Sequence, residues 1–134
     1  MNNLRAYAEI NLDAIAHNVQ ELRRITDPSA ELIAVVKADG YGHGAKMVSK
    51  TALENGATRL AVAFIDEALE LRKAGIKAPI LILGYTAPEL AEEAVANDLT
   101  VTVFSKEIVE ALSQKSQELN KPAKVHVKVD TGMT

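Results

Sequence analysis

One stretch near the N-terminus combines residue types that can do chemistry on a small molecule: "IAVVKADGYGHGA", residues 33–45. An apolar run ends at Lys37, and glycines follow at positions 40, 42 and 44. A lysine amine can form a Schiff base with a carbonyl compound and can also act as a general base. Glycines allow positive φ angles and let a ligand approach the backbone closely, and the phenol of Tyr41 can donate a hydrogen bond to a phosphate.

The position of Lys37 agrees with such a role, because parallel α/β folds place catalytic residues at the carboxyl ends of their strands. Two other interpretations stay open on these residues alone. Lys37 can be a solvated charge at a strand end. The segment "GYGHGA", residues 40–45, also matches the G-x-G-x-x-A pattern of dinucleotide-binding turns. That match is weak, because "KAD" separates the apolar run from the first glycine and no acidic residue ends the second run.

Composition and charge exclude several other classes of function. His17, His43 and His126 are isolated and the chain has no cysteine, so we predict no metal site. The lack of cysteine also excludes disulfides and fits a reducing, cytoplasmic location. A net charge of −3 gives no electrostatic footprint for nucleic acid. No apolar run approaches the ~20 residues of a membrane span, so we expect no membrane insertion.

The elements that must position Lys37 follow from five short apolar, β-branched runs with helical periodicity between them. These predicted strands are residues 31–36, 59–63, 78–83, 99–104 and 123–129. A further short strand, residues 6–10, is predicted before an amphipathic helix over residues 11–25. Strands that alternate with helices imply right-handed βαβ units and a parallel sheet.

Residues typical of helix ends mark the segments between these runs. Asp66 is predicted to cap one helix, and Gly75 to end it. The segment from Thr86 to Glu89 resembles a capping box, with Pro88 at the first helical position. Ser105 is predicted to be the N-cap of a helix whose apolar stripe is Ile108, Leu112 and Leu119.

Two architectures fit this pattern: a complete five-stranded doubly wound sheet, or part of a (β/α)₈ TIM barrel, which needs ~250 residues. No helix follows the last run, which ends in "KVDTGMT". We therefore expect residues 1–134 to form the N-terminal half of a TIM barrel, truncated after its fifth strand. Half a barrel leaves two strand edges and an apolar concave face uncovered, so we expect the chain to self-associate.

Alternation along the strands predicts which side chains face the barrel interior. It places Ile33, Val35 and Lys37 on one face of the first run. In the fifth run, the valines at 125, 127 and 129 share the helix side, so His126 and Lys128 would point inward. The alternative is an edge strand whose charged face is simply solvated.

The residues quoted above carry a resemblance to a known family. "AVVKADGYGHGA" resembles the attachment motif for pyridoxal 5′-phosphate (PLP) of bacterial alanine racemases, and "KVDTGM" resembles a second stretch of that family. Residues 66–84 also resemble its second and third βα units. Some members have Asn-Ala where this chain has Asp39-Gly40, which leaves the lysine and tyrosine in register.

The resemblance implies a role for each matching residue. Lys37 would hold PLP as a Schiff base and exchange the α-proton on the D-alanine side. Tyr41 would donate a hydrogen bond to the cofactor phosphate. Lys128 is carbamylated in some members, where it positions an arginine that would lie beyond this chain. The agreement with its inward orientation leads us to expect a buried role for Lys128.

The activity implied is the interconversion of L-alanine and D-alanine, which supplies D-alanine for peptidoglycan, by a cytoplasmic homodimeric isomerase. In the family, the opposing base is a tyrosine from a C-terminal β-domain, which we expect to be absent here. We therefore expect residues 1–134 alone to be inactive. A single-domain PLP-binding carrier, which has the barrel and lysine without the β-domain, and a dinucleotide-binding module are the alternatives.

Overall fold

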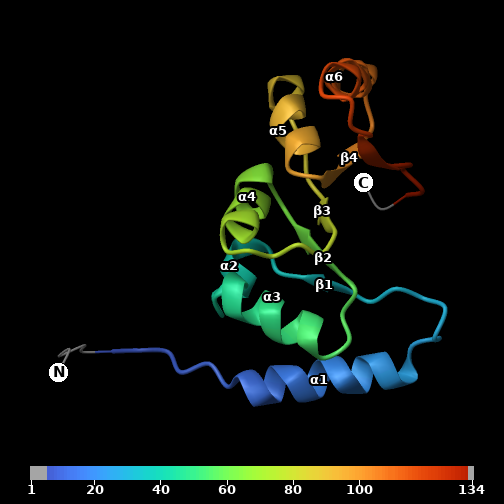
Figure 1. Cartoon of the computed structure of the whole chain (residues 1–134). Helices are drawn as coiled ribbons and strands as arrows, with labels where there is room; N and C mark the ends of the chain where they lie inside the picture. The colour runs from blue at the N-terminus through green and yellow to red at the C-terminus, as the bar shows by residue number, and fades with distance from the viewer. Residues whose placement is uncertain (1–5, 133–134) are drawn as a thin grey trace.

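The computed structural model describes residues 6–132 (Figure 1). Met133, the last residue of "KVDTGM", therefore lies outside the described part of the chain. Five strands and the helices between them follow one another along the sequence. Their bounds are α1 Leu12–Ile25, β1 Ile33–Val35, α2 Lys37–Tyr41, α3 Ala45–Glu54, β2 Arg59–Val62, α4 Ile65–Lys73, β3 Ile80–Ile82, the 3₁₀-helix η1 Pro88–Leu90, α5 Ala91–Ala96, β4 Leu99–Val103, α6 Lys106–Glu118 and β5 Lys124–Val127.

The five strands form one parallel sheet whose spatial order is the same as their order in the sequence. This confirms all five predicted strand runs. It also decides between the two architectures, because a doubly wound sheet reverses its strand order at a switch point, whereas a barrel adds each strand beside the last. The fold is therefore the α/β arrangement of half a barrel.

The core lies between the sheet and the helices that cover one of its faces. Leu60, Ile80 and Leu99 are in register on neighbouring strands, and all three are buried. They pack with buried residues of the covering helices, such as Leu71 of α4 and Leu112 of α6. In Figure 1, α4, α5 and α6 follow one another along this side of the sheet. Burial of this apolar face is the main force that holds the helices on the sheet.

The opposite face of the sheet is only partly open, because Ala61, Thr100 and Thr102 in its middle are buried. Ile33 and Val35 of β1 remain exposed, whereas Val36 is buried on the helix side. This confirms the alternation predicted for the first run. The same face carries Leu83 and Phe104, which follow β3 and β4 and are also exposed. A group of exposed apolar side chains on one face of a sheet is normally covered by another layer of protein.

The fifth strand has the predicted orientation. Val125 and Val127 are in register with the buried residues Val101 and Val103 of β4, which places them on the helix side. His126 is in register with Thr102, so it lies on the open face. Val127 is nevertheless 74% exposed.

The N-terminal segment differs from the prediction. Residues 6–10 do not form a strand, because they make no ladder with the sheet and run to α1 as an irregular segment. Helix α1 does form, and Asn11 caps it by accepting a hydrogen bond from the backbone N–H of Ala14 at 3.0 Å. No residue of α1 is buried. The helix lies against α3, where Gln20 donates a hydrogen bond to Asn55 at 2.7 Å.

Gly75 ends α4 as predicted, with a φ angle of 85°, but two predicted N-caps are wrong and a third is right only in position. Helix α4 begins at Ile65, so Asp66 lies in its first turn rather than before it. Ala87, not Thr86, precedes η1, and no side chain caps it, although Pro88 does occupy the first helical position. Ser105 is the N-cap of α6, but its hydroxyl makes no capping bond to the backbone and instead lowers the pKa of Glu107 by hydrogen bonding to that carboxylate.

Candidate active site

Lys37 lies where β1 ends, at the carboxyl edge of the sheet. The strand itself stops at Val35, and the backbone N–H of Val36 continues the pairing by donating to the carbonyl of Ala61 at 2.8 Å. Lys37 is half-buried and is the first residue of α2. The sequence therefore predicted the place of Lys37 in the fold correctly.

The turn that follows Lys37 has an unusual backbone. Ala38, Asp39, Gly40 and Tyr41 all have positive φ angles, between 50° and 62°, so they form one turn of left-handed helix. Three of these residues carry a Cβ atom, and the left-handed conformation costs such a residue roughly 1–2 kcal/mol. Backbone strain of this kind persists only where surrounding contacts enforce it, and it is typical of functional sites.

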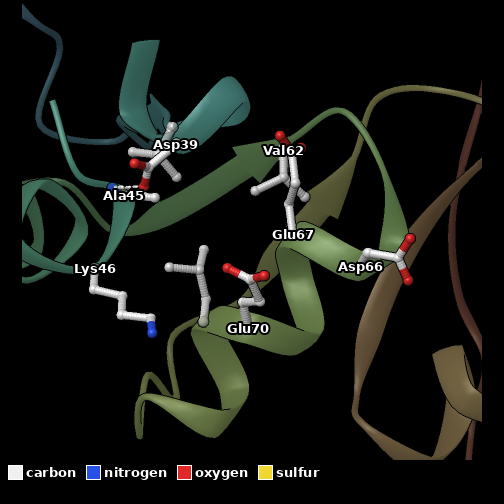
Figure 2. A pocket seen from close by; sticks show the side chains of 9 residues that line it. Asp39, Ala45, Lys46, Val62, Asp66, Glu67 and Glu70 are labelled. Carbon is white, nitrogen blue, oxygen red and sulfur yellow. Dashed lines mark hydrogen bonds between the residues drawn. The ribbon is translucent and has the colours of Figure 1, made fainter. Parts of the chain in front are cut away.

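Part of the left-handed turn is held by α3. The carboxylate of Asp39 accepts a hydrogen bond at 2.8 Å from the backbone N–H of Ala45, the first residue of that helix (Figure 2). Gly40 is buried, and a Cβ atom there would lie 3.2 Å from the nitrogen of Ala45. A side chain at position 40 would therefore be in tight contact with the start of α3, in a backbone conformation that favours glycine.

Glu67 holds the turn from the other side. One of its carboxylate oxygens accepts a hydrogen bond from the backbone N–H of Ala38 at 2.6 Å. The other accepts from the backbone N–H groups of Ala63, at 2.7 Å, and Phe64, at 3.2 Å. One side chain on α4 thus joins the loop after β1 to the end of β2. Glu67 is not among the site residues predicted from the sequence, although its position three residues after the N-cap of α4 is typical of a capping-box glutamate.

Open space lies beside the second half of the glycine segment. Gly42 and Gly44 have φ angles of 81° and 86°, which confirms the expected glycine conformations. A Cβ atom at either residue would have no atom within 4 Å. Tyr41, just before them, is 58% exposed. A primary amine, a phenol and an uncovered stretch of backbone are thus gathered within a few residues at one edge of the sheet.

These groups fit what PLP requires of a protein. The cofactor's aldehyde needs a lysine amine, and its phosphate needs hydrogen-bond donors with room around them. Lys37 offers the amine, Tyr41 offers a donor, and the backbone at Gly42 and Gly44 leaves the room.

Lys128 is not brought next to Lys37. The backbone N–H of Lys128 donates to the carbonyl of Val103 at 2.9 Å, which places it just after β5, at the other end of the sheet order from β1. Both lysines still lie at the carboxyl edge of the parallel sheet. Lys128 is exposed, so the burial that we expected is not found among the described residues.

A second cluster of polar side chains lies beside α4. Helix α4 lines a pocket of about 230 Å³ together with Asp39, Lys46 and other residues of the first βα unit, and Figure 2 shows Asp66 pointing away from Asp39 there. Within residues 6–132, no group of three or more histidine, aspartate or glutamate side chains is arranged to hold a metal ion. No helix in the described part of the chain is both long and apolar enough to cross a membrane.

A charge pair stabilises the opposite, amino edge of the sheet. Asp98 precedes β4 and pairs with Lys124 of β5 at 2.8 Å. The hydrogen bond from Lys124 is the main cause that lowers the pKa of Asp98 below its usual value of 3.8. In folds of this type, the edge opposite the catalytic one serves stability.

Comparison with known proteins identifies the family. The family model "Alanine racemase, N-terminal domain" matches residues 10–134. The alanine racemase of Methanococcus maripaludis is 54% identical over 96% of this chain, and alanine racemase 1 of Oceanobacillus iheyensis is 51% identical over 96%. The chain spans only about a third, 34%, of the length of each of these curated relatives.

Solved structures give the same result. The alanine racemase of Clostridium difficile 630 superimposes with a TM-score of 0.95 at 40% identity, covering 100% of this chain and 35% of that one. The Bacillus anthracis alanine racemase with bound L-Ala-P gives a TM-score of 0.86 at 45% identity, covering 97% of this chain and 34% of that one. The fold, the strained turn after Lys37 and the match over nearly all of the sequence agree with one another. This chain belongs to the alanine racemase family.

Proposed function

We propose that this chain supplies the cofactor-binding lysine and the first half of the barrel of an enzyme that interconverts L-alanine and D-alanine. The observation that carries the proposal is the place of Lys37, half-buried at the carboxyl end of β1 and followed by a held left-handed turn. The membership of the chain in the alanine racemase family supports the same reaction. Such an enzyme would be cytoplasmic and would supply D-alanine for peptidoglycan.

Lys37 and Tyr41 are the residues that would hold PLP. When bound, PLP supplies an electron sink that stabilises negative charge at the α-carbon of an amino acid. The Nζ atom of Lys37 would bind the cofactor aldehyde and, once released, accept or return the α-proton on the D-alanine side. The phenol of Tyr41 would donate a hydrogen bond to the phosphate, which can approach because Gly42 and Gly44 leave the backbone uncovered.

Racemisation needs a second base, because the proton that leaves one face of the α-carbon must be replaced on the other. Lys37 and Tyr41 come from the same turn at the carboxyl edge, so we expect Lys37 to reach only one face of the α-carbon. We propose that the opposing base belongs to the two thirds of the relatives' length that this chain does not span. Lys128, with or without carbamylation, would then orient residues of that remaining part.

The exposed face and the two strand edges also support the proposal that the rest of the site lies outside this chain. β1 and β5 are the terminal strands of the sheet, and the apolar side chains opposite the helices are exposed. The remaining strands of a barrel would cover them, and the whole enzyme would act as a homodimer. Alone, this chain would be inactive and would associate with itself.

A completed enzyme tests this proposal. In it, residues 10–134 of this chain replace the matching third of the Methanococcus maripaludis alanine racemase, to which the chain is 54% identical. We expect the completed enzyme to form D-alanine from L-alanine, the isolated chain to form none, and Lys37→Ala to abolish activity in the completed enzyme. Sustained turnover by the isolated chain would show that the second base was misplaced, and full activity of the Lys37→Ala variant would overturn the role of Lys37.

A further inference from the structure

The backbone around Lys37 is fixed on both sides. Before it, Val36 is buried, and its N–H donates to the carbonyl of Ala61 in β2 at 2.8 Å. After it, the N–H of Ala38 donates to Glu67 at 2.6 Å. The carbonyl of Val36 also accepts from the N–H of Gly40 at 2.9 Å, which closes the left-handed turn. Lys37 is therefore a half-buried residue between two immobilised neighbours.

Glu67 is itself fixed independently of the turn. Its second carboxylate oxygen accepts hydrogen bonds from Ala63 and Phe64, at the end of β2 and the start of α4. A carboxylate that accepts backbone N–H groups forms charge-assisted bonds, which are stronger than bonds between neutral groups. A single side chain, that of Glu67, thus connects the backbone at Ala38 to the end of β2.

Ala38 begins the left-handed turn with a φ angle of 50°. The first N–H groups of a helical turn have no partner inside that turn, and the N–H of Ala38 finds its acceptor in Glu67. Without that acceptor, Ala38 and Asp39 would relax toward φ angles that suit residues with a Cβ atom. The direction of the Lys37 side chain would then change with them.

We propose that Glu67 is a positioning residue, which fixes the backbone after Lys37 so that the Lys37 amine is aimed at the cofactor and the α-carbon. This inference rests on the proposed function and deepens it. Glu67 does not touch the reacting atoms in this account. It acts through Ala38, by stabilising a left-handed turn that residues with a Cβ atom disfavour.

The decisive variant is Glu67→Gln in the completed enzyme. Whichever way the glutamine amide turns, an NH₂ group replaces one of the two accepting oxygens and faces a backbone N–H. The matched control is Asp66→Asn, which removes a charge of the same sign from the same turn of α4, where the residue is exposed. Glu67→Asp, which keeps the charge but shortens the side chain, serves as a milder variant if Glu67→Gln does not fold.

Two measurements report on the turn itself. The first is hydrogen exchange of the peptide covering residues 36–44 in the protein without PLP. The second is the rate at which borohydride traps an adduct at Lys37 after PLP is added. We expect Glu67→Gln to accelerate exchange at least tenfold, to slow adduct formation by about 10- to 100-fold, and to lower kcat similarly with little change in the KM for alanine. Asp66→Asn should resemble the unmodified protein, and Glu67→Asp should be intermediate.

A rescue variant separates positioning from simple capping of α4. Ala38→Gly lowers the conformational cost of the positive φ angle at position 38. The double variant with Glu67→Gln and Ala38→Gly should therefore form the Lys37 adduct at least threefold faster than Glu67→Gln alone. A cap of α4 would gain nothing from that change. Unchanged exchange and adduct rate in the folded Glu67 variants, or no recovery with Ala38→Gly, would overturn the inference. The absence of any Lys37 adduct in the unmodified completed enzyme would instead overturn the proposed function.

Discussion

At the scale of single residues, the candidate site depends on a backbone conformation that most side chains avoid. The left-handed turn after Lys37 contains one buried glycine, Gly40, where a Cβ atom would lie in tight contact, 3.2 Å from the backbone nitrogen of the first residue of α3. Asp39 and Glu67 hold the same turn from α3 and α4, respectively. Even the addition of one methyl group within this turn should therefore lower the free energy of unfolding.

Substitution of Gly40 by alanine should destabilise this chain more than the same substitution of Gly42. Both residues have positive φ angles, so each change carries the conformational cost, about 1 kcal/mol. At position 40 the new Cβ atom would in addition lie 3.2 Å from the backbone nitrogen of Ala45, which is anchored by Asp39. We expect Gly40→Ala to lower the free energy of unfolding by roughly 2 kcal/mol in urea titrations. Equal effects of the two substitutions would contradict this packing.

The sequence predicted where Lys37 lies in the fold but not the contacts of Glu67, and the reason is physical. Alternation of apolar residues showed where β1 would end, and Lys37 stands at that point. The left-handed conformation of Ala38 and Asp39 has no such signature, because neither residue favours it and contacts distant in sequence impose it. The capping-box position of Glu67 is a sequence signal for the start of α4, but its contact with Ala38 is visible only in three dimensions.

At the scale of elements, the five strands were predictable because each is a compact apolar run that pairs in parallel with its neighbour. Helix ends were less predictable. Asp66 has the residue type of a cap, but α4 begins at Ile65, two residues before the start that an Asp66 cap would give, and the side chain of Ile65 is buried. Residues 6–10 alternate like a strand, yet they form no ladder with the described sheet.

The pair between Asp98 and Lys124 ties β4 to β5 and should make stability depend on pH. The pKa of Asp98 is lower in the folded chain than its usual value of 3.8, chiefly because Lys124 donates a hydrogen bond to it. The stabilisation is therefore present above that value and is lost as the pH falls below it through the folded pKa. Because both side chains are nearly half exposed, the pair contributes less than about 1 kcal/mol.

Lys124→Met should thus lower the free energy of unfolding slightly at pH 7, and the difference from the unmodified chain should shrink as the pH falls below 3.8. Urea unfolding between pH 7 and pH 3 measures this. Lys77→Met, which removes the same charge from an exposed position, provides the control. A difference between the Lys124 variant and the unmodified chain that stays constant down to pH 3 would contradict the pairing.

At the scale of the whole molecule, the chain has one well-covered face and one open face. The open side carries exposed apolar residues such as Val35, and β1 and β5 offer unpaired backbone along the two edges of the sheet. An unpaired strand edge can hydrogen-bond to a strand of another chain, and an exposed apolar face can pack against another apolar surface. In the proposed enzyme the complement is the rest of the barrel.

The isolated chain should therefore associate with itself. Light scattering over a range of concentrations should give masses that rise above the 14.4 kDa of one chain. Val127→Lys places a charge at the β5 edge, and Val35→Lys places one on the open face, so the two variants show which surface is responsible. A stable monomer at high concentration would count against this account of the open face.

The most direct test of the central claim is to locate the covalent attachment of PLP. The completed enzyme is incubated with PLP, reduced with borohydride and digested, and the modified peptide is identified by mass spectrometry. We predict a single stable adduct on Lys37, which Lys37→Ala abolishes and Lys128→Ala does not. An adduct on another lysine, with Lys37 unmodified, would contradict the account.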